Sequence, residues 1–552
     1  MKPIQKINLM RRYLFILILL LNLSPLKAQI VNEKPKLVVG IVVDQMRYDY
    51  LTRFWGQFGD EGFKRLVNEG FNFKNNHFNY VPTYTGPGHA SVFTGTTPEY
   101  NGIIGNGWFD KFENKSVYCA GDDSVESVGT TSEAGRMSPH RMKSTTFGDE
   151  NRLHTQMKGK TIGIALKDRG AILPAGHTAN AAYWFHGREE AKWITSTYYM
   201  KGLPDWVKNF NNSEKAKTYL KTWNTLRDIN SYKESGVDEN DFEFGYQGKE
   251  TATFPYDLKT LASENGEYEL IKATPFGNDL TAEFAKAAIK GENLGKDDVT
   301  DVLTLSFSST DYVGHNFGVN SKEIEDTYLR LDLALADVLK YLDQTVGEGE
   351  YTVFLTADHG GVDVPSYLKS RKIPSGYFDD VTENKKIEEF VREEFKVDSL
   401  IQNISNSQIF LDYKVMRGEG LDAHKVQQKI AHYLLQQKSI SRVYTREQLQ
   451  SGSFTKGISS LIQNGFNQER SGDVVFVLDP GYIIYPEKGT THGSGFIYDT
   501  HVPLIFFGKG IKHGSSLERT VIPDIAPTIS AMLGISYPDA SSGKPLSIIL
   551  ED

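Results

Sequence analysis

Five short apolar runs, rich in β-branched residues, recur along this chain of 552 residues. They are residues 37–43, 161–166, 302–307, 352–357 and 502–507. Asp44, Lys167 and Asp358 directly follow the first, second and fourth runs, and Asp311 follows the third after a short gap. Continuous apolar runs of this length are typical of strands buried on both faces, as in parallel sheets. Because open α/β sheets bind ligands at the carboxyl ends of their strands, we expect these polar side chains to mark a functional edge.

Helical patterns alternate with the predicted strands. Apolar residues recur at helical spacing over 324–342, and residues 281–289 and 524–533 also have helical patterns. This alternation predicts an α/β fold with a doubly wound, mostly parallel central sheet in one catalytic domain over residues 29–552. Three polar stretches lack the alternation, and we interpret them as insertions that cap the sheet: 108–150, 186–275 and 363–480.

The first 28 residues have the order of a secretory signal peptide. A basic start precedes the apolar residues 14–21, and Ala28 precedes the expected cleavage point. The apolar run is shorter than the roughly 20 residues of a membrane span. Leu26 is larger than the residue usual at that position, so a retained anchor is the alternative. We expect a periplasmic or secreted protein with no stable membrane insertion after signal cleavage.

Charge and cysteine content exclude several functional classes. Residues 1–28 carry five basic and no acidic side chains, so their removal takes the formal net charge from −9 to −14. An acidic chain is poorly suited to neutralise phosphates, so we expect no nucleic-acid partner. Cys119 is the only cysteine, which excludes an intramolecular disulfide framework and any Cys-rich metal site.

Aspartates and histidines gather in motifs near the predicted strand ends. Asp311 and His315 are four residues apart, so they share one face of a helical turn. With three further motifs they form a set of three Asp and three His: Asp44, Asp311, His315, Asp358, His359 and His492. A single Asp at a strand end is more often a helix cap, but six such ligands at one sheet edge favour zinc or a similar divalent ion. We interpret His89 and His501 as structural or supporting residues.

Two more motifs fit chemistry on an anion. Residues 82–89 place a hydroxyl between Pro and Gly at a forced turn, where a metal could activate it as a nucleophile. Spacing does not choose between Thr83 and Thr85. Lys167 and Arg169, two residues apart in an extended segment, would point the same way as a cationic pair. The alternative for residues 82–89 is an ordinary loop, and the alternative for Lys167 and Arg169 is a solvated basic turn.

The ordered motifs resemble those of the alkaline phosphatase superfamily of two-metal hydrolases over nearly the whole mature chain. Asp311-x-x-x-His315, Asp358-His359 and the late His492 carry this resemblance. The Lys-x-Arg element is similar to that of the phosphate-irrepressible (PafA-type) alkaline phosphatases of Gram-negative bacteria. The resemblance implies a central sheet of alkaline-phosphatase type and two Zn²⁺ ions as cofactors.

The resemblance also implies the role of each site residue. One zinc ion would be held by Asp311, His315 and His492. The other would be held by Asp44, Asp358 and His359, with Thr85 as a further ligand. Thr85 matches the catalytic nucleophile of the family. The residues that would bind the phosphoryl oxygens are Asn106, Lys167 and Arg169.

These roles predict an exported alkaline phosphatase that acts on small-molecule phosphate monoesters, and we expect it to be a monomer. It would form a covalent phospho-threonine at Thr85 and release inorganic phosphate. The principal alternative is a phosphodiesterase or nucleotide pyrophosphatase on the same two-metal core. A sulfatase, a metal-dependent mutase and a non-catalytic zinc- or phosphate-binding protein are the remaining alternatives. The chain lacks the Cys/Ser-x-Pro-x-Arg pattern that sulfatases would require.

Overall fold

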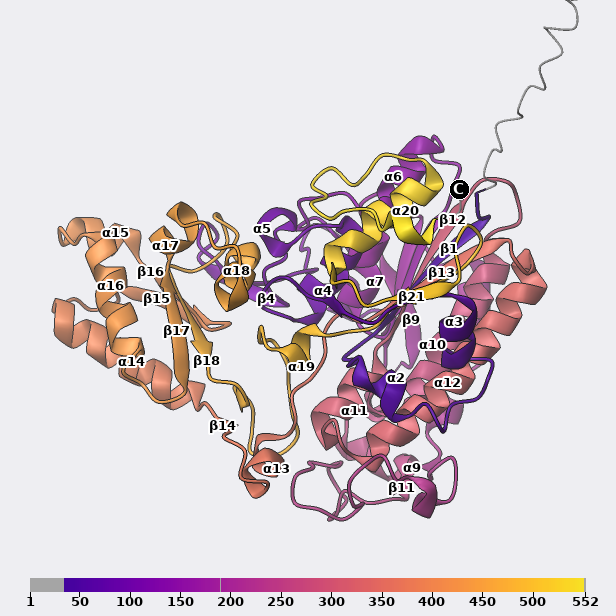
Figure 1. Ribbon diagram of the computed structural model, residues 1–552, viewed down its shortest axis with the longest axis horizontal. Coiled ribbons are helices and arrows are strands. Elements are labelled where there is room, and N and C mark those ends of the chain that lie inside the picture. Colours follow the sequence, from indigo (N-terminus) through magenta and orange to yellow (C-terminus); the bar gives the residue numbers. More distant parts are fainter. Residues whose placement is uncertain (1–33, 189, 551–552) are drawn as a thin grey trace, which may run out of the picture. The chain divides into compact units, whose positions relative to one another are not determined.

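A ten-stranded mixed sheet lies at the centre of the structure, a computed structural model that describes residues 34–188 and 190–550 (Figure 1). The predicted signal peptide, residues 1–28, lies outside the described residues. In spatial order the strands are β21 (Gly514–Ser516), β2 (Phe71–Phe73), β20 (Leu504–Gly508), β13 (Tyr351–Thr356), β1 (Leu37–Val43), β12 (Asp301–Phe307), β7 (Thr161–Ala165), β8 (Ala181–His186), β9 (Lys192–Ser196) and β6 (Ser127–Val128).

The five strands from β13 to β8 run parallel and form the core of this sheet. Every residue of β1, β12, β13 and β7 is buried, which explains why these strands are continuous apolar runs. The run at 502–507 corresponds to β20, which pairs antiparallel with β13. It packs in the same sheet but does not contribute a carboxyl end to the same edge.

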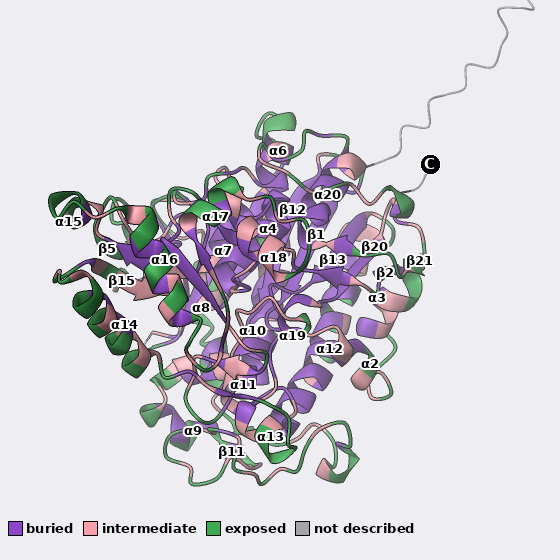
Figure 2. Ribbon diagram, turned by 60° about the vertical axis from the view of Figure 1, so that its left-hand side comes forward, coloured by how far each residue is buried: buried purple, intermediate pink, exposed green. Residues whose placement is uncertain are grey.

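Helices cover the sheet in two groups, as a doubly wound fold requires (Figure 1). One group comprises α4 (Thr85–Thr94), α6 (Phe147–His154), α7 (Asp168–Ala175) and α20 (Ile525–Leu533). The other comprises α3 (Phe63–Glu69), α10 (Pro275–Gly291), α11 (Ser309–Phe317) and α12 (Lys322–Leu342). Strands are buried between the helices, whose exposed residues lie on their outer sides (Figure 2). The predicted α/β class with a mostly parallel, doubly wound sheet is confirmed.

Residues 363–480 contain a second, four-stranded antiparallel sheet with its own buried apolar cluster. Its strands in spatial order are β15 (Ile401–Ser405), β16 (Gln408–Leu411), β18 (Val474–Leu478) and β17 (Ile440–Thr445), and α14 (Asp380–Phe395) and α16 (Ala423–Leu434) pack against it. The stretches 108–150 and 186–275 also supply β6 and β9 to the central sheet. The boundaries of the cap insertions stay a prediction.

Short elements complete the described chain. The helices are α2 (Asp49–Arg53), α5 (Pro98–Asn101), α8 (Asp205–Asn212), α9 (Leu258–Leu261), α13 (Pro365–Ser370), α15 (Tyr413–Gly418), α17 (Arg446–Ser451), α18 (Gly457–Gly465) and α19 (Ile497–Thr500). The strands are β3 (Asn76–His77), β4 (Gly107–Asp110), β5 (Lys115–Tyr118), β10 (Thr222–Trp223), β11 (Tyr256–Asp257), β14 (Gly376–Tyr377), β19 (Tyr482–Ile483) and β22 (Thr520–Val521). Within residues 34–188 and 190–550, none of the helices combines the length and apolar character needed to cross a bilayer.

Candidate active site

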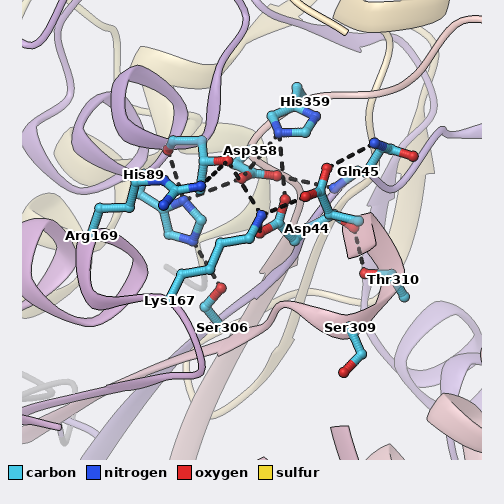
Figure 3. A network of polar contacts seen from close by, with 12 residues as sticks. Asp44, Gln45, His89, Lys167, Arg169, Ser306, Ser309, Thr310, Asp358 and His359 are labelled. Atoms are coloured by element: carbon cyan, nitrogen blue, oxygen red, sulfur yellow. Dashed lines mark hydrogen bonds and ion pairs between the residues drawn. The ribbon is translucent and has the colours of Figure 1, made fainter. Parts of the chain in front are cut away.

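Four neighbouring parallel strands end at one edge of the central sheet, and each end carries a predicted site residue. In the spatial order β13, β1, β12 and β7, the chain continues into Asp358, Asp44, Asp311 and Lys167. All four side chains are buried. Figure 3 shows Asp44, Asp358 and Lys167 directed toward one another. The strand order therefore brings together residues that are up to 314 positions apart in the sequence.

One candidate metal group consists of Asp44, Asp358 and His359. Their ligand atoms lie within 4.8 Å of one another, and all three side chains are fully buried. Among the described residues, Asp44 Oδ1, Asp358 Oδ2 and His359 Nε2 have no hydrogen-bond partner. Burial, together with the charge of Asp358, raises the pKa of Asp44 well above its usual range. Buried carboxylates and an imidazole nitrogen with free lone pairs are the donors that a divalent cation would satisfy.

A second group of ligand atoms within 4.8 Å consists of Asp311, His492 and again His359. The rings of His359 and His492 stack with their centroids 3.4 Å apart, so the two groups adjoin. His315, assigned to this group from the sequence, places its Nε2 atom 3.2 Å from Asp311 Oδ1. Asp311 is buried, but the charges of His315 and Lys167 outweigh that burial and lower its pKa.

The three histidines share one orientation. The Nδ1 atom of each lies within hydrogen-bond distance of a main-chain carbonyl oxygen: 2.7 Å for His315, 2.9 Å for His359 and 2.8 Å for His492. Since a carbonyl only accepts, each Nδ1 carries a proton, and Nε2 is the nitrogen that remains to face an ion. This is the arrangement that zinc-binding histidines adopt in proteins, so the donor set fits the implied ions.

Thr85 is the first residue of α4, where the helix dipole favours negative charge. The Nζ atom of Lys167 and the Nη2 atom of Arg169 each lie 3.5 Å from Thr85 Oγ1. Thr83 is directed elsewhere, because its hydroxyl donates to the carbonyl of Ser494 at 2.8 Å. The geometry therefore distinguishes two threonines that spacing alone left equivalent.

Lys167 and Arg169 do not lie in the extended segment that the sequence pattern predicted. Lys167 precedes α7 and Arg169 lies inside it, so the pair occupies a strand-to-helix junction and not an extended segment. Lys167 Nζ lies 2.7 Å from Asp44 Oδ2 and 2.6 Å from Asp311 Oδ2. Burial alone would lower the pKa of Lys167, but the Asp311 and Asp44 carboxylates raise it above its usual range. Both cations still converge on Thr85.

Asn106 lies in the loop before β4, beside the start of α4. Its Oδ1 atom accepts a hydrogen bond from the main-chain N–H of Gly86 at 2.7 Å. This bond fixes the amide next to Thr85. The second sheet reaches the same loop, because Asn406 Nδ2 donates to the carbonyl of Gly107 at 2.7 Å.

Several supporting residues were not identified from the sequence. Gln45 contacts two of the ligand carboxylates, and the Tyr118 hydroxyl accepts a hydrogen bond from Arg169 Nη1 at 3.1 Å. Asp499 accepts bonds from the loop that follows His492. The only sequence signal was the position of Gln45 directly after Asp44, since the other two lie in segments without a motif.

The two histidines interpreted as structural occupy different surroundings. His89 is buried on α4, with Nδ1 2.9 Å from the carbonyl of Thr85 and Nε2 2.9 Å from Ser306 Oγ. It also lies 3.3 Å from Asp358 Oδ2, so it supports the site from behind. His501 instead stacks on Tyr48 and contacts the carbonyl of Lys74.

Comparisons with known proteins agree with this geometry. Residues 38–502 match the family model described as type I phosphodiesterase / nucleotide pyrophosphatase. The chain is 46% identical over 524 residues to a Myroides odoratus protein named calcium-transporting ATPase, covering 94% of this chain and 95% of that one. It is 45% identical over 523 residues to alkaline phosphatase PafA of Elizabethkingia meningoseptica, with coverage of 94% and 95%.

A solved structure provides the same comparison in three dimensions. The crystal structure of wild-type alkaline phosphatase PafA superimposes with a TM-score of 0.90 at 45% identity, covering 94% of this chain and 99% of that one. The family predicted from the ordered motifs is thus confirmed. The chain belongs to the type I phosphodiesterase / nucleotide pyrophosphatase family within the alkaline phosphatase superfamily, and it is an alkaline phosphatase of the PafA type.

Proposed function

We propose that this protein is an exported two-zinc phosphomonoesterase that hydrolyses small phosphate monoesters through a covalent phospho-threonine at Thr85. The observation that carries the proposal is the convergence of Lys167 and Arg169 on Thr85 Oγ1, directly beside two groups of metal-ligand side chains. Export to the periplasm or medium follows from the signal-like residues 1–28, and we expect the mature protein to be a monomer.

The proposed ligands are those of the two groups. Asp311, His315 and His492 would hold one zinc ion, and Asp44, Asp358 and His359 would hold the other. The fit is supported by the unpartnered ligand atoms of Asp44, Asp358 and His359 and by the shared orientation of the three histidines. Two zinc ions bound here would supply Lewis-acid stabilisation of the attacking and leaving oxygens.

The chain's own residues then account for the reaction at phosphorus. Thr85 Oγ1 gives up its proton and forms a bond to phosphorus while the ester P–O bond breaks, and the leaving oxygen takes up a proton and departs as the alcohol. Water then attacks phosphorus and the Thr85 Oγ1–P bond breaks, so that one proton of the water restores the Thr85 hydroxyl and inorganic phosphate is released. The α4 N-terminus and the Asn106 amide are placed to receive phosphoryl oxygens near Thr85.

The cationic pair favours monoesters over diesters. A monoester dianion carries more negative charge on its non-bridging oxygens than a diester does. Lys167 is buried and Arg169 is half-buried, and both lie within reach of that charge, where low polarity strengthens the attraction. A phosphodiesterase or nucleotide pyrophosphatase activity is the second candidate, because the matched family model has that description.

The test is a comparison of initial rates for the zinc-loaded protein on matched aryl phosphate monoester, diester and sulfate substrates. We expect the monoester rate to dominate, to vanish with chelator and to return with zinc. A dominant diester rate would leave the metal sites in place but overturn the role given to the cationic pair. Zinc binding without turnover would instead favour a binding protein.

A further inference from the structure

Gln45 occupies an unusual position at the end of β1. Its side chain is 2% exposed, and its backbone φ is +61°, in the left-handed region that non-glycine residues rarely adopt. Such conformations persist where the surroundings hold them in place, and they concentrate at functional sites. Figure 3 shows Gln45 beside Asp44, at one side of the polar network.

The conformation lets one residue reach a carboxylate in each metal group. The main-chain N–H of Gln45 donates to Asp358 Oδ1 at 3.2 Å. Its side-chain Nε2 donates to Asp311 Oδ1 at 2.7 Å. Asp358 and Asp311 follow different strands, β13 and β12, which flank β1 on either side. Gln45 therefore restrains both carboxylates from the strand between them.

Two motif glycines leave the space that this side chain fills. A Cβ atom at Gly314 would lie 1.9 Å from Gln45 Oε1, and a Cβ atom at Gly361 would lie 3.2 Å from Gln45 Cδ. Neither glycine has a positive φ, so neither is required for backbone freedom. Gly314 lies inside the Asp311-x-x-x-His315 motif, and Gly361 closes Asp358-His359-Gly-Gly. Two separate ligand motifs thus accommodate the same glutamine.

We propose that Gln45 is a positioning residue that holds the Asp311 and Asp358 carboxylates in the orientation needed to bind zinc at both groups. Each hydrogen bond occupies one lone pair of a carboxylate and fixes the plane of the group, which leaves the remaining lone pairs directed into the site. This inference rests on the proposed two-zinc site, although it does not depend on which ester is hydrolysed.

The first test compares Gln45→Met with the wild-type protein. Methionine matches the length of glutamine but has no N–H donor, so only the side-chain bond to Asp311 is removed. Loss of such an outer partner typically lowers metal affinity by about 10- to 100-fold. We expect that loss in zinc titrations against a competing chelator, together with an altered visible absorption spectrum of the cobalt-substituted protein. Gln427→Met, at a buried glutamine of the second sheet domain, is the matched control and should change neither.

The second test uses the space at position 314. Gly314→Ala should weaken zinc binding in the wild-type background, because the added methyl group displaces Gln45. In a Gln45→Ala background the displaced oxygen is gone, so the same substitution should cost little further affinity. Such non-additivity is the signature of two positions that act through one contact. If Gln45→Met does not fold, this pair of variants still decides the matter.

Several results would overturn the inference. The first is a Gln45→Met protein with the zinc affinity and cobalt spectrum of the wild type. The second is a loss of zinc affinity on Gly314→Ala that is as large in the Gln45→Ala background as in the wild type. The third is a wild-type protein that binds no zinc. Failure of the proposed function is distinguishable, because it would appear as zinc binding that still depends on Gln45 in a protein that turns over no phosphate monoester.

Discussion

Removal of the Arg169 guanidinium is the sharpest perturbation of the proposed substrate preference. Arg169 Nη2 lies 3.5 Å from Thr85 Oγ1, and Tyr118 contacts its other terminal nitrogen. Unlike Lys167, Arg169 forms no ion pair with Asp44 or Asp311, so Arg169→Ala leaves those carboxylates with their existing cation. The Lys167→Ala, Arg169→Ala double variant then removes the whole pair.

The expected magnitude follows from the distances. Two unit charges about 4 Å apart interact by about 4 kcal/mol at an effective dielectric constant near 20. If about half of the additional charge of a monoester lies near each cation, each contributes about 2 kcal/mol of preference. At 1.36 kcal/mol per tenfold, that is roughly 30-fold for Arg169→Ala and roughly 1,000-fold for the double variant.

The assay measures kcat/KM at saturating zinc for an aryl phosphate monoester and for its methyl diester. The monoester value should fall by these factors relative to the diester value. Zinc content measured in the same preparations controls for changed metal binding. Equal losses on both substrates would refute the reasoning, because a cation that does not sense the additional charge cannot determine the preference.

Two further predictions concern the supports of the site. Asp499 is buried, burial raises its pKa to about 7, and the unfolded chain titrates near pH 4. The native state therefore retains a proton that the unfolded state releases, so the wild-type free energy of unfolding should fall by about 4 kcal/mol between pH 4 and pH 7 through this group. In urea unfolding at pH 4.5, 6 and 8, the free energy of unfolding of Asp499→Asn should lack this fall with rising pH. The same pH dependence in Asp499→Asn and in the wild type would contradict the assignment. A Cβ atom at Gly88 would lie 2.2 Å from the carbonyl oxygen of Asp358, so Gly88→Ala should destabilise the protein by roughly 1–3 kcal/mol and lower kcat by moving Thr85. Gly202→Ala is the control for Gly88→Ala, because no atom lies within 4 Å of the added carbon. Equal melting temperatures and equal rates for the two variants would contradict the prediction for Gly88.

Much of the fold was predictable because burial leaves a local trace in the chain. A strand buried on both faces must be apolar throughout, and β1, β7, β12 and β13 meet that condition over their whole length. Strands that are short or lie toward the sheet edge, such as β2 and β6, were not predicted. Two or three residues are too few to establish a period of two.

The candidate site was predictable to the extent that its residues lie in motifs. Asp311, His315 and the later ligands are recognisable by type and spacing, and their family resemblance assigned Thr85. Sequence alternation could not reveal that β20 runs antiparallel, since an apolar run is the same in either direction. Nor could it show that Lys167 contacts Asp44 and Asp311 as well as Thr85.

Local composition was thus enough to identify the long buried strands, the class of fold and the chemical types gathered at the strand ends. Tertiary structure alone decided that β13, β1, β12 and β7 are neighbours, because strand order depends on packing between segments far apart in the chain. The same packing places Gln45, which simply follows Asp44 in the sequence, in contact with two ligand carboxylates. It also explains why positions 314 and 361 are glycines. The side chain of Gln45, which follows another strand, occupies the space that a Cβ atom at either position would need.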